Sequence, residues 1–600
     1  MAQQALASAC CALALLFSTA GWALENRLID HPSPYLALHG ADPVAWQTWN
    51  ARTIALARQQ HKLIYVSIGY FSCHWCHVMQ QESYRNPDIA ALLNRNFIPV
   101  KVDRELETGL DGYLQDFAER TRGQAGWPLN VFLTPEGYPL LAVLYLPPQD
   151  FLGVLTQLST RWGQQAPQLS ALARAFISKA MPVRAEPINA GLRDGLEQLF
   201  NNEVMARADL FQGGFGPVNK FPMAPQLDAL LAIQARQPRD ATRSFLTLTL
   251  DQMMRLGLYD AVGGGFFRYT TDPDWHTPHF EKMLYDNAQL AMLYLRAADV
   301  FKRRAYRDTA HATLDFMAAI LQDPKTGGLV SSASAIDDQN REGATYLWQR
   351  SELQRLLTAD ELRAVEKTWR LDLPADSAYG YLPMQRVQPD SNALSILSGA
   401  YRKLAQARAK RSLPLDSKQI AGLNGLALSA FSRAAAIAPR HAVSAAKVRN
   451  FLVNQLLRQG RLAKAYAAGH KLGAGELEDY VYVAAGLADY ADFTGRRDDR
   501  AMALALLRTA WKRFFSAAGW KTQEASLLPG MRVQAALADG ATPSAAAQLI
   551  AVSLASGDRG LRKQALQALS LGLPDTRQAV FWHASYLAAL NAAVVQSGRK

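Results

Sequence analysis

Two cysteines separated by two residues, Cys73 and Cys76, follow an apolar run that the sequence predicts to be a strand, residues 63–69. The residues after them, 78–82, are compatible with a helix. A Cys-x-x-Cys pair at a strand-to-helix junction is typical of dithiol redox domains. The helix dipole would stabilise a thiolate on the first cysteine, and the second, one turn later, can resolve a mixed disulfide. The motif therefore predicts an α/β domain built around a reactive thiol pair.

His74 and Trp75 lie between the two cysteines. A neighbouring imidazolium lowers the pKa of a thiol, so we expect His74 to tune Cys73, and we count Trp75 with the candidate catalytic residues. Three other interpretations stay open. With His77 the run matches the attachment pattern of c-type haem. A zinc site would need a second, distant pair of ligands. An inert structural disulfide would stabilise little, because the loop that it closes is so short.

Pro128 precedes another apolar run, residues 129–133, about fifty residues after the cysteines. Cis peptide bonds are essentially confined to X–Pro, and we predict one here, where it would place backbone beside the thiols to bind an extended substrate. The pattern around it predicts a strand, the thiol helix, a strand, a helix, the proline strand, a hairpin strand and a helix, which is the order of a thioredoxin-like domain. The other predicted elements include a helix from Asp42 to about Gln60, a strand over 97–103 and a helix over 109–120.

The first 23 residues are interpreted as a secretion signal. Residues 9–17 are apolar but too few to cross a membrane, and Gly21-Trp22-Ala23 offers small residues at a cleavage spacing. The segment departs from the usual pattern because no Lys or Arg precedes Arg27. We therefore expect a periplasmic or secreted protein with no integral membrane segment after removal of the signal.

Cleavage would remove Cys10 and Cys11 and leave Cys73 and Cys76 as the only cysteines. Because disulfides persist outside the cytosol, this pair is the candidate for thiol–disulfide exchange. The expected partner is a protein thiol or disulfide. We expect no metal ion and no cofactor. The formal net charge is +12, but the Lys and Arg residues are scattered without blocks, which indicates a solvated surface and no nucleic-acid partner.

A chain of 600 residues is too long for one core, and its pattern changes near residue 190. From there, Ala- and Leu-rich helices alternate with glycine turns at 213–216, 263–266 and 327–329. Helical hairpins that each need a neighbour to bury an apolar face predict a toroid or a solenoid. The predicted organisation is a thioredoxin-like domain over 24–165, a linker over 166–189 and a helical domain over 190–600.

Several motifs match one known family in order and in spacing. The matching segments are 31–36, 42–46, 67–70, 73–79, 102–105, 126–129, 213–216, 220–222, 259–269 and 278–288. On these residues the chain resembles the YyaL / spermatogenesis-associated protein 20 type family. The resemblance implies a multidomain chain, in which an α/β thioredoxin-like domain is followed by an all-α (α/α)6 toroid similar to N-acylglucosamine 2-epimerases and six-hairpin glycosidases.

In such toroids the inner helices line a funnel whose carboxylates and aromatic rings suit sugars. A carbohydrate-active or carbohydrate-binding toroid with a non-catalytic thioredoxin-like module is therefore an alternative function, and a scaffold for protein contacts is a third. The funnel carboxylates can equally serve to tie helices together. Ala545-Ala546 replaces a Gly-Asn pair of the family, which weakens the case for sugar turnover. The candidate funnel residues are Asp272, Trp275, His276, His279, Glu281, Asp286, Glu478 and Asp479.

Overall fold

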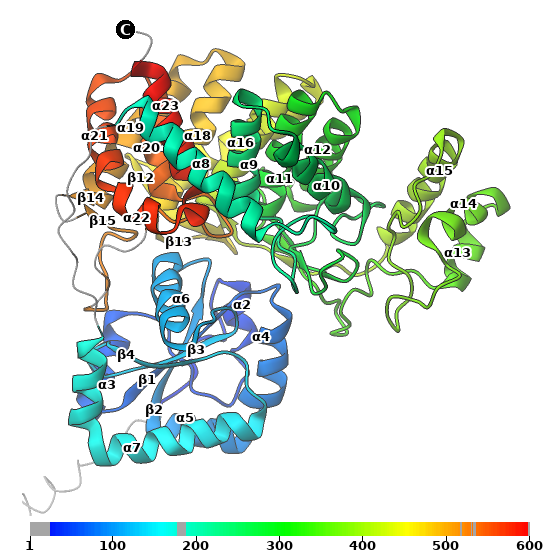
Figure 1. Cartoon of the computed structure of the whole chain (residues 1–600). Helices are drawn as coiled ribbons and strands as arrows, with labels where there is room; N and C mark the ends of the chain where they lie inside the picture. Colours follow the sequence, from blue (N-terminus) through cyan, green and yellow to red (C-terminus); the bar gives the residue numbers. More distant parts are fainter. Residues whose placement is uncertain (1–23, 177–187, 517–518, 530, 532–535, 598–600) are drawn as a thin grey trace, which may run out of the picture.

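The computed structural model describes residues 24–176, 188–516, 519–529, 531 and 536–597, and the predicted signal segment lies outside them. An α/β domain, drawn in blue, lies against one end of a helical ring, and a small group of helices projects from the side of that ring (Figure 1). None of the described helices is both long enough and apolar enough to cross a membrane.

The α/β domain is built on a four-stranded sheet in the order β2-β1-β3-β4. Strand β1 (Leu63–Gly69) runs parallel to β2 (Phe97–Asp103) and antiparallel to β3 (Leu129–Leu133), which pairs in turn with β4 (Pro139–Val143). Every residue of β1 and β2 is buried, because helices cover both faces of the sheet. The strands predicted over 63–69 and 97–103 are confirmed.

Alternate side chains of the sheet enter two separate cores, as the two-residue period of a strand requires. Tyr65 and Phe132 enter one core, and Ile64 and Val131 enter the other. The domain is thus a thioredoxin-like sandwich. The helices on the Tyr65 face are α4 (His74–Met79), α5 (Pro87–Asn96) and α7 (Pro148–Ala175), and those on the Ile64 face are α3 (Ala51–Gln60) and α6 (Thr108–Arg122).

The helix predicted to begin at Asp42 begins instead at Ala51, where the side chain of Asn50 accepts the backbone N–H of Thr53. Asp42 is buried, and its carboxylate accepts hydrogen bonds from the Trp46 indole and from the Gln80 amide. A tertiary role thus replaces the capping role that local sequence suggested.

Helix α7 departs from helical geometry at Gln165 and then continues to Ala175, so part of the predicted linker is helical.

The second domain is an (α/α)6 toroid, because six inner helices contact one another in a closed ring and each has an outer helix packed on it. The ring runs through α9 (Ala224–Arg236), α11 (Leu284–Phe301), α16 (Ala421–Ala435), α18 (Leu477–Thr494), α20 (Ala545–Ala555) and α23 (Ala584–Ser597). The outer helices are α8 (Ala190–Arg207), α10 (Asp240–Arg255), α12 (Arg304–Phe316), α17 (Ala442–Phe451), α19 (Arg497–Phe514) and α21 (Arg559–Leu571).

Three further helices interrupt the ring sequence between α12 and α16 and stand to its side in Figure 1. They enclose a small core of their own, which includes Trp348 and Trp369. Arg408, at the end of this insertion, forms a 2.9 Å ion pair with Asp260 of the toroid and so anchors it. The inserted helices are α13 (Arg350–Leu356), α14 (Ala359–Trp369) and α15 (Ser391–Arg408).

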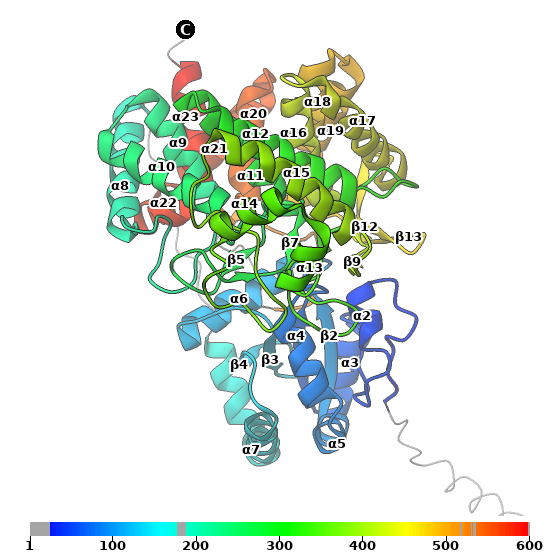
Figure 2. The ribbon, with the colours of Figure 1, turned by 90° about the vertical axis from the view of Figure 1, so that its right-hand side faces the viewer.

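The α/β domain lies across the ring end at which inner helices α11, α16 and α18 begin (Figure 2). Ser72 contacts Met283, which precedes α11; Asp103 pairs with Lys418, which precedes α16; and the α6 backbone bonds to Glu476, which precedes α18. Apolar packing is continuous across the boundary. The thioredoxin-like domain therefore covers the mouth of the toroid, where the predicted funnel residues lie.

Candidate functional site

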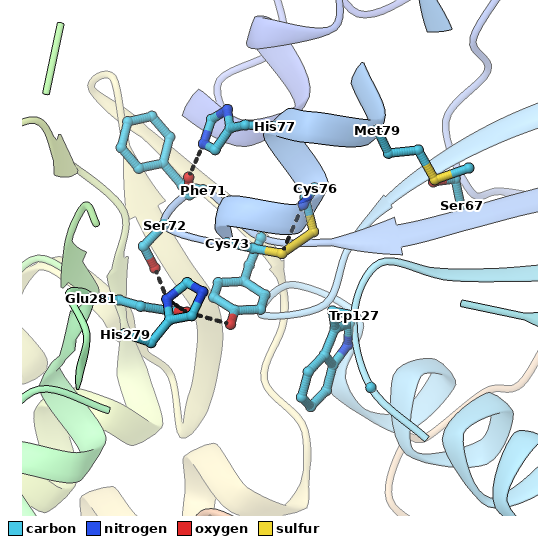
Figure 3. Close-up of a disulfide and its surroundings, with 12 residues drawn as sticks. Ser67, Phe71, Ser72, Cys73, Cys76, His77, Met79, Trp127, His279 and Glu281 are labelled. Carbon is cyan, nitrogen blue, oxygen red and sulfur yellow. Dashed lines mark hydrogen bonds and ion pairs between the residues drawn. A yellow bond between two sulfur atoms is a disulfide. The ribbon is translucent and has the colours of Figure 1, made fainter. Parts of the chain in front are cut away.

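Cys73 and Cys76 are joined in a disulfide at the point where β1 gives way to α4 (Figure 3). Cys73 is the N-cap residue of α4, and its sulfur accepts the backbone N–H of Cys76 at 3.2 Å. A thiolate released at this sulfur would be stabilised by that N–H and by the helix dipole. The sulfurs are well covered, since Cys73 is 3% and Cys76 1% exposed.

The Trp127–Pro128 peptide bond is cis, which confirms the prediction for this position. Figure 3 places Trp127 beside the disulfide. Its indole N–H donates to Asp111 at 2.9 Å, its ring meets that of Tyr70 edge-on at 5.8 Å, and the Arg104 guanidinium lies 4.0 Å from its centroid. These contacts fix the strand entrance at Pro128 next to the thiol pair.

Glu281 of the toroid reaches the segment that leads into the disulfide. One of its carboxylate oxygens accepts the Tyr70 hydroxyl at 3.1 Å, and the other accepts the Ser72 hydroxyl at 3.3 Å. Arg268 pairs with Glu281 at 3.4 Å and also donates to the Tyr70 hydroxyl. Burial raises the pKa of Glu281, against the lowering influence of Arg268. The toroid thus holds Tyr70 and Ser72, which lie just before the thiol motif.

His74 and His279 face each other across the domain boundary with their ring centroids 5.8 Å apart. The carboxylate of Glu342 lies between them, 3.7 Å from the ring nitrogen Nδ1 of His74 and 3.6 Å from that of His279. Burial lowers the pKa of His279 to about 4, although Glu342 opposes the shift, so His279 is neutral at pH 7. The toroid therefore adds a neutral imidazole and a carboxylate to the surroundings of the thiol pair.

His77 turns away from the disulfide, and a ring nitrogen lies 2.7 Å from the carbonyl oxygen of Phe71 (Figure 3). Burial lowers the pKa of His77. Because the two sulfurs are bonded to each other and this ring is engaged locally, the geometry favours the dithiol interpretation of the motif. Among the described residues, no group of three or more His, Cys, Asp and Glu side chains could hold a metal ion.

Three of the predicted funnel residues shape a hairpin beside the mouth. Asp272 accepts the backbone N–H groups of His276 and Thr277, and so fixes the turn. Trp275 is fully buried at φ 64°, and its indole N–H donates to the Gln212 carbonyl oxygen at 2.9 Å. Asp272 and Trp275 therefore have structural roles, whereas His276 is half-exposed in the loop of the hairpin.

Glu478 and Asp479 lie at the start of α18, on the buried side chain of Lys464. The Lys464 ammonium lies 2.8 Å from Glu478 and 3.2 Å from Asp479. Asp479 also accepts the backbone N–H of Gly422 at 2.9 Å. Burial raises the pKa of Asp479 to about 6, against the lowering effect of Lys464. Asp479 thus ties α18 to α16, and both carboxylates hold the lysine of the strand Arg461–Ala467, a structural role of the kind considered as the alternative to sugar binding.

Asp286 lies deeper in the mouth, in the first turn of α11, and burial raises its pKa to about 7. Its Oδ2 atom, the Tyr285 hydroxyl and the Gln289 Oε1 atom have no hydrogen-bond partner among the described residues. Arg104 of the thioredoxin-like domain acts electrostatically on both Tyr285 and Asp286. The polar groups of this region therefore come from both domains.

The sequence prediction missed several residues of this site, above all Glu342, Arg268 and Lys418. Arg268 lies within one of the motifs that carried the family resemblance, so that motif was the available signal. Lys418, with Asp416, matches the family pattern upstream of 423–426, which was the available signal, but no local pattern marks its charge as buried. Its ammonium pairs with Asp103 at 2.9 Å and Glu105 at 3.2 Å. Glu342 follows a polar loop, and no sequence feature distinguished it.

These features define the class: a thioredoxin-like disulfide domain closed against the mouth of an (α/α)6 toroid. The family model Thioredox_DsbH, described as a protein of unknown function, DUF255, matches residues 25–181. Spermatogenesis-associated protein 20 of Homo sapiens is 33% identical over 597 aligned positions, which cover 87% of this chain and 74% of that protein. The chain belongs to the spermatogenesis-associated protein 20 family.

Two solved structures align with parts of the chain. A cellobiose 2-epimerase from Spirochaeta thermophila aligns with 68% of this chain and 99% of its own, at 14% identity and a TM-score of 0.42. A thioredoxin from Thermus thermophilus aligns with 20% of this chain and 90% of its own, at 24% identity and a TM-score of 0.17.

Proposed function

We propose that the chain is an exported thiol–disulfide oxidoreductase that uses the Cys73–Cys76 pair. The observation that carries the proposal is the disulfide at the N-terminus of α4. The Cys73 sulfur forms the mixed disulfide with substrate in either direction, and Cys76 resolves that disulfide. His74 adjusts the reactivity of the Cys73 thiol, and Pro128 positions the substrate backbone. Trp75, 45% exposed, lies at the surface where a substrate arrives.

Exchange proceeds in two steps. In the oxidising direction, a substrate thiolate attacks Cys73, a mixed disulfide forms, and Cys76 leaves with the electron pair and takes up a proton. The second substrate thiolate attacks the mixed disulfide, and Cys73 leaves as the stabilised thiolate. The substrate thereby loses two electrons to the protein. In the reducing direction the Cys73 thiolate attacks a substrate disulfide and expels one substrate thiolate. Cys76 then attacks the mixed disulfide and releases the second, and a dithiol of the compartment reduces the resulting Cys73–Cys76 bond.

Intact mass after alkylation tests the proposal. In protein purified without reductant we expect both cysteines to alkylate only after mild reduction, and equilibration in glutathione buffers to give a defined redox potential. The same spectrum reports whether the first 23 residues are removed. Protein exposed to an oxidising glutathione buffer that still alkylates at both cysteines without reduction would contradict the proposal.

A carbohydrate-binding toroid is the second candidate, favoured by the buried and unpartnered polar atoms of Tyr285, Asp286 and Gln289. Unpaired buried acceptors destabilise a fold, and sugar hydroxyls can donate to them. We expect a sugar ligand to raise the melting temperature of a variant without either cysteine, and Asp286→Asn to abolish the rise. Asp308→Asn, at an exposed position, is the control. An equal rise in the Asp286→Asn protein would remove this candidate.

A further inference from the structure

A continuous run of six rings leads from the toroid to the thioredoxin-like domain, partly or fully exposed except at His279, which is buried. Successive rings from the toroid stack at 4.5 and 5.1 Å between centroids, the boundary is crossed at 5.8 Å, and the last two steps are 5.6 and 5.0 Å. The fourth ring belongs to His74, which directly follows Cys73. We call this run the aromatic strip, and in order its members are Phe221, Tyr269, His279, His74, Trp75 and Tyr145.

The aromatic strip is accessible at both ends. Phe221, the first ring, is 41% exposed, and Trp75, the fifth, is 45% exposed next to the half-buried Tyr145. The loop that carries Phe221 also exposes Phe211, at 89%, and Val218, at 60%. Large exposed rings that gather in one place indicate an interaction surface, whereas scattered ones do not. Half of the strip belongs to the toroid, so this surface extends beyond the thioredoxin-like domain.

The edges of the aromatic strip are negatively charged, although the chain as a whole carries +12. Three basic side chains of the segments that form the strip are already paired, Lys220 with Asp209, Arg268 with Glu281 and Arg341 with Asp337, whereas Arg85, near Glu82, donates to the Gln81 amide oxygen. No lysine or arginine of the described chain pairs with Glu82, Asp272 or Glu342. A partner that fits this surface therefore combines apolar side chains with positive charge.

We propose that the aromatic strip docks an extended polypeptide segment, apolar and basic, that carries the cysteine exchanged with Cys73. The inference rests on the proposed redox function and names its substrate class. A substrate cysteine bonded to Cys73 places its neighbouring residues over His74 and the adjoining rings. In an extended segment alternate side chains face the same way, so apolar ones can pack on the rings while Lys or Arg meets the carboxylate edge. The toroid thus takes part in selecting the substrate.

The test compares three reduced dithiols as substrates of the full-length oxidised protein. One peptide has Phe, Leu and Lys around its cysteines, a matched peptide has Ser and Glu there, and dithiothreitol reports the disulfide itself. We expect kcat/KM to be about tenfold higher for the basic, apolar peptide than for its match. Phe221→Ser should lower the ratio of peptide to dithiothreitol rates several-fold. Leu394→Ser, at a half-exposed position on α15, should leave that ratio unchanged.

Charge provides a second and independent variant. Glu82→Lys, at an exposed position, should reduce the preference for the lysine-containing peptide, and raising NaCl from about 0.05 to 0.5 M should do the same, because salt screens exposed charges. The proposal would be overturned if the ratio of the two peptide rates were the same in wild type, Phe221→Ser and Glu82→Lys. It would also be overturned if a neutral oligosaccharide inhibited the reaction and an unreactive basic, apolar peptide did not. A wild type that reacts with neither peptides nor dithiothreitol would overturn the redox function itself.

Discussion

Replacement of Cys73 by serine is expected to reduce dithiol exchange to the uncatalysed rate. The Cys73 sulfur lies at the N-cap of α4 and accepts the N–H of Cys76, which makes it the better-stabilised thiolate of the pair. A serine hydroxyl is neither oxidised nor ionised under these conditions, so no mixed disulfide can form at this position. The measurement is the rate of exchange with dithiothreitol, monitored through the appearance of oxidised dithiothreitol.

Cys76→Ser is the matched variant, because it removes the resolving thiol and keeps the attacking one. With a substrate that carries a disulfide, we expect the Cys73 thiolate of the reduced Cys76→Ser protein to expel one substrate thiolate and form a mixed disulfide that persists and is seen as a stable mass increase. Exchange at the wild-type rate in the Cys73→Ser protein would show that the pair is not the reactive centre, whatever the fold around it.

Replacement of Lys418 by methionine is expected to destabilise the junction of the two domains by about 3–5 kcal/mol, the range for removing one partner of a buried ion cluster. The Lys418 ammonium is fully buried and pairs with Asp103, Glu105 and Asp416. The carboxylates raise its pKa, although burial alone would lower it. Without the ammonium three buried carboxyls remain with no cation. Urea unfolding, followed by tryptophan fluorescence, is the measurement.

The loss of stability in the Lys418→Met protein should depend on pH. Burial raises the pKa of Asp416 to about 7 even in the wild type, so its folded-state pKa lies above its unfolded value. A neutral carboxyl tolerates burial, and the penalty therefore grows as pH rises through 7 and shrinks toward pH 5. Lys403→Met, which removes a partly exposed ion pair with Glu361, should cost at most about 1 kcal/mol. Equal losses of stability in Lys418→Met and Lys403→Met would contradict the assignment of Lys418 as a buried cation that stabilises the domain junction.

Much of the thioredoxin-like domain was predictable because its signals are local. Strand β1 is an uninterrupted apolar run, and the Cys73 motif and Pro128 mark positions whose geometry follows from residue type. The helical domain was predictable as a set of hairpins, but residue patterns alone left toroid and solenoid open. Closure depends on α9 meeting α23, a contact between segments far apart in the chain that no local period encodes.

The composition of the site was harder to predict for the same reason. His279 and Glu281 were candidates for a sugar funnel, and their placement against Tyr70 and His74 depends on how the two domains dock. Asp42 has the sequence context of a helix cap, yet burial beside Trp46 and Gln80 gives it another role. Local propensity is a weak guide wherever a tertiary contact competes with it.

The closed ring sets an order of events during synthesis. The strands and helices of the thioredoxin-like domain are complete by Ala175, although Leu528 joins its core much later, and the ring whose mouth the domain covers cannot close until α23 meets α9. Domains generally fold in order from the N-terminus as the chain is made, at roughly 5–20 residues per second, so the remaining segment takes tens of seconds to appear. During that interval we expect Cys73 and Cys76 to be less shielded than in the complete fold, where they are 3% and 1% exposed. The nascent chain therefore passes through a stage in which its thiols are more reactive than they will be in the finished protein.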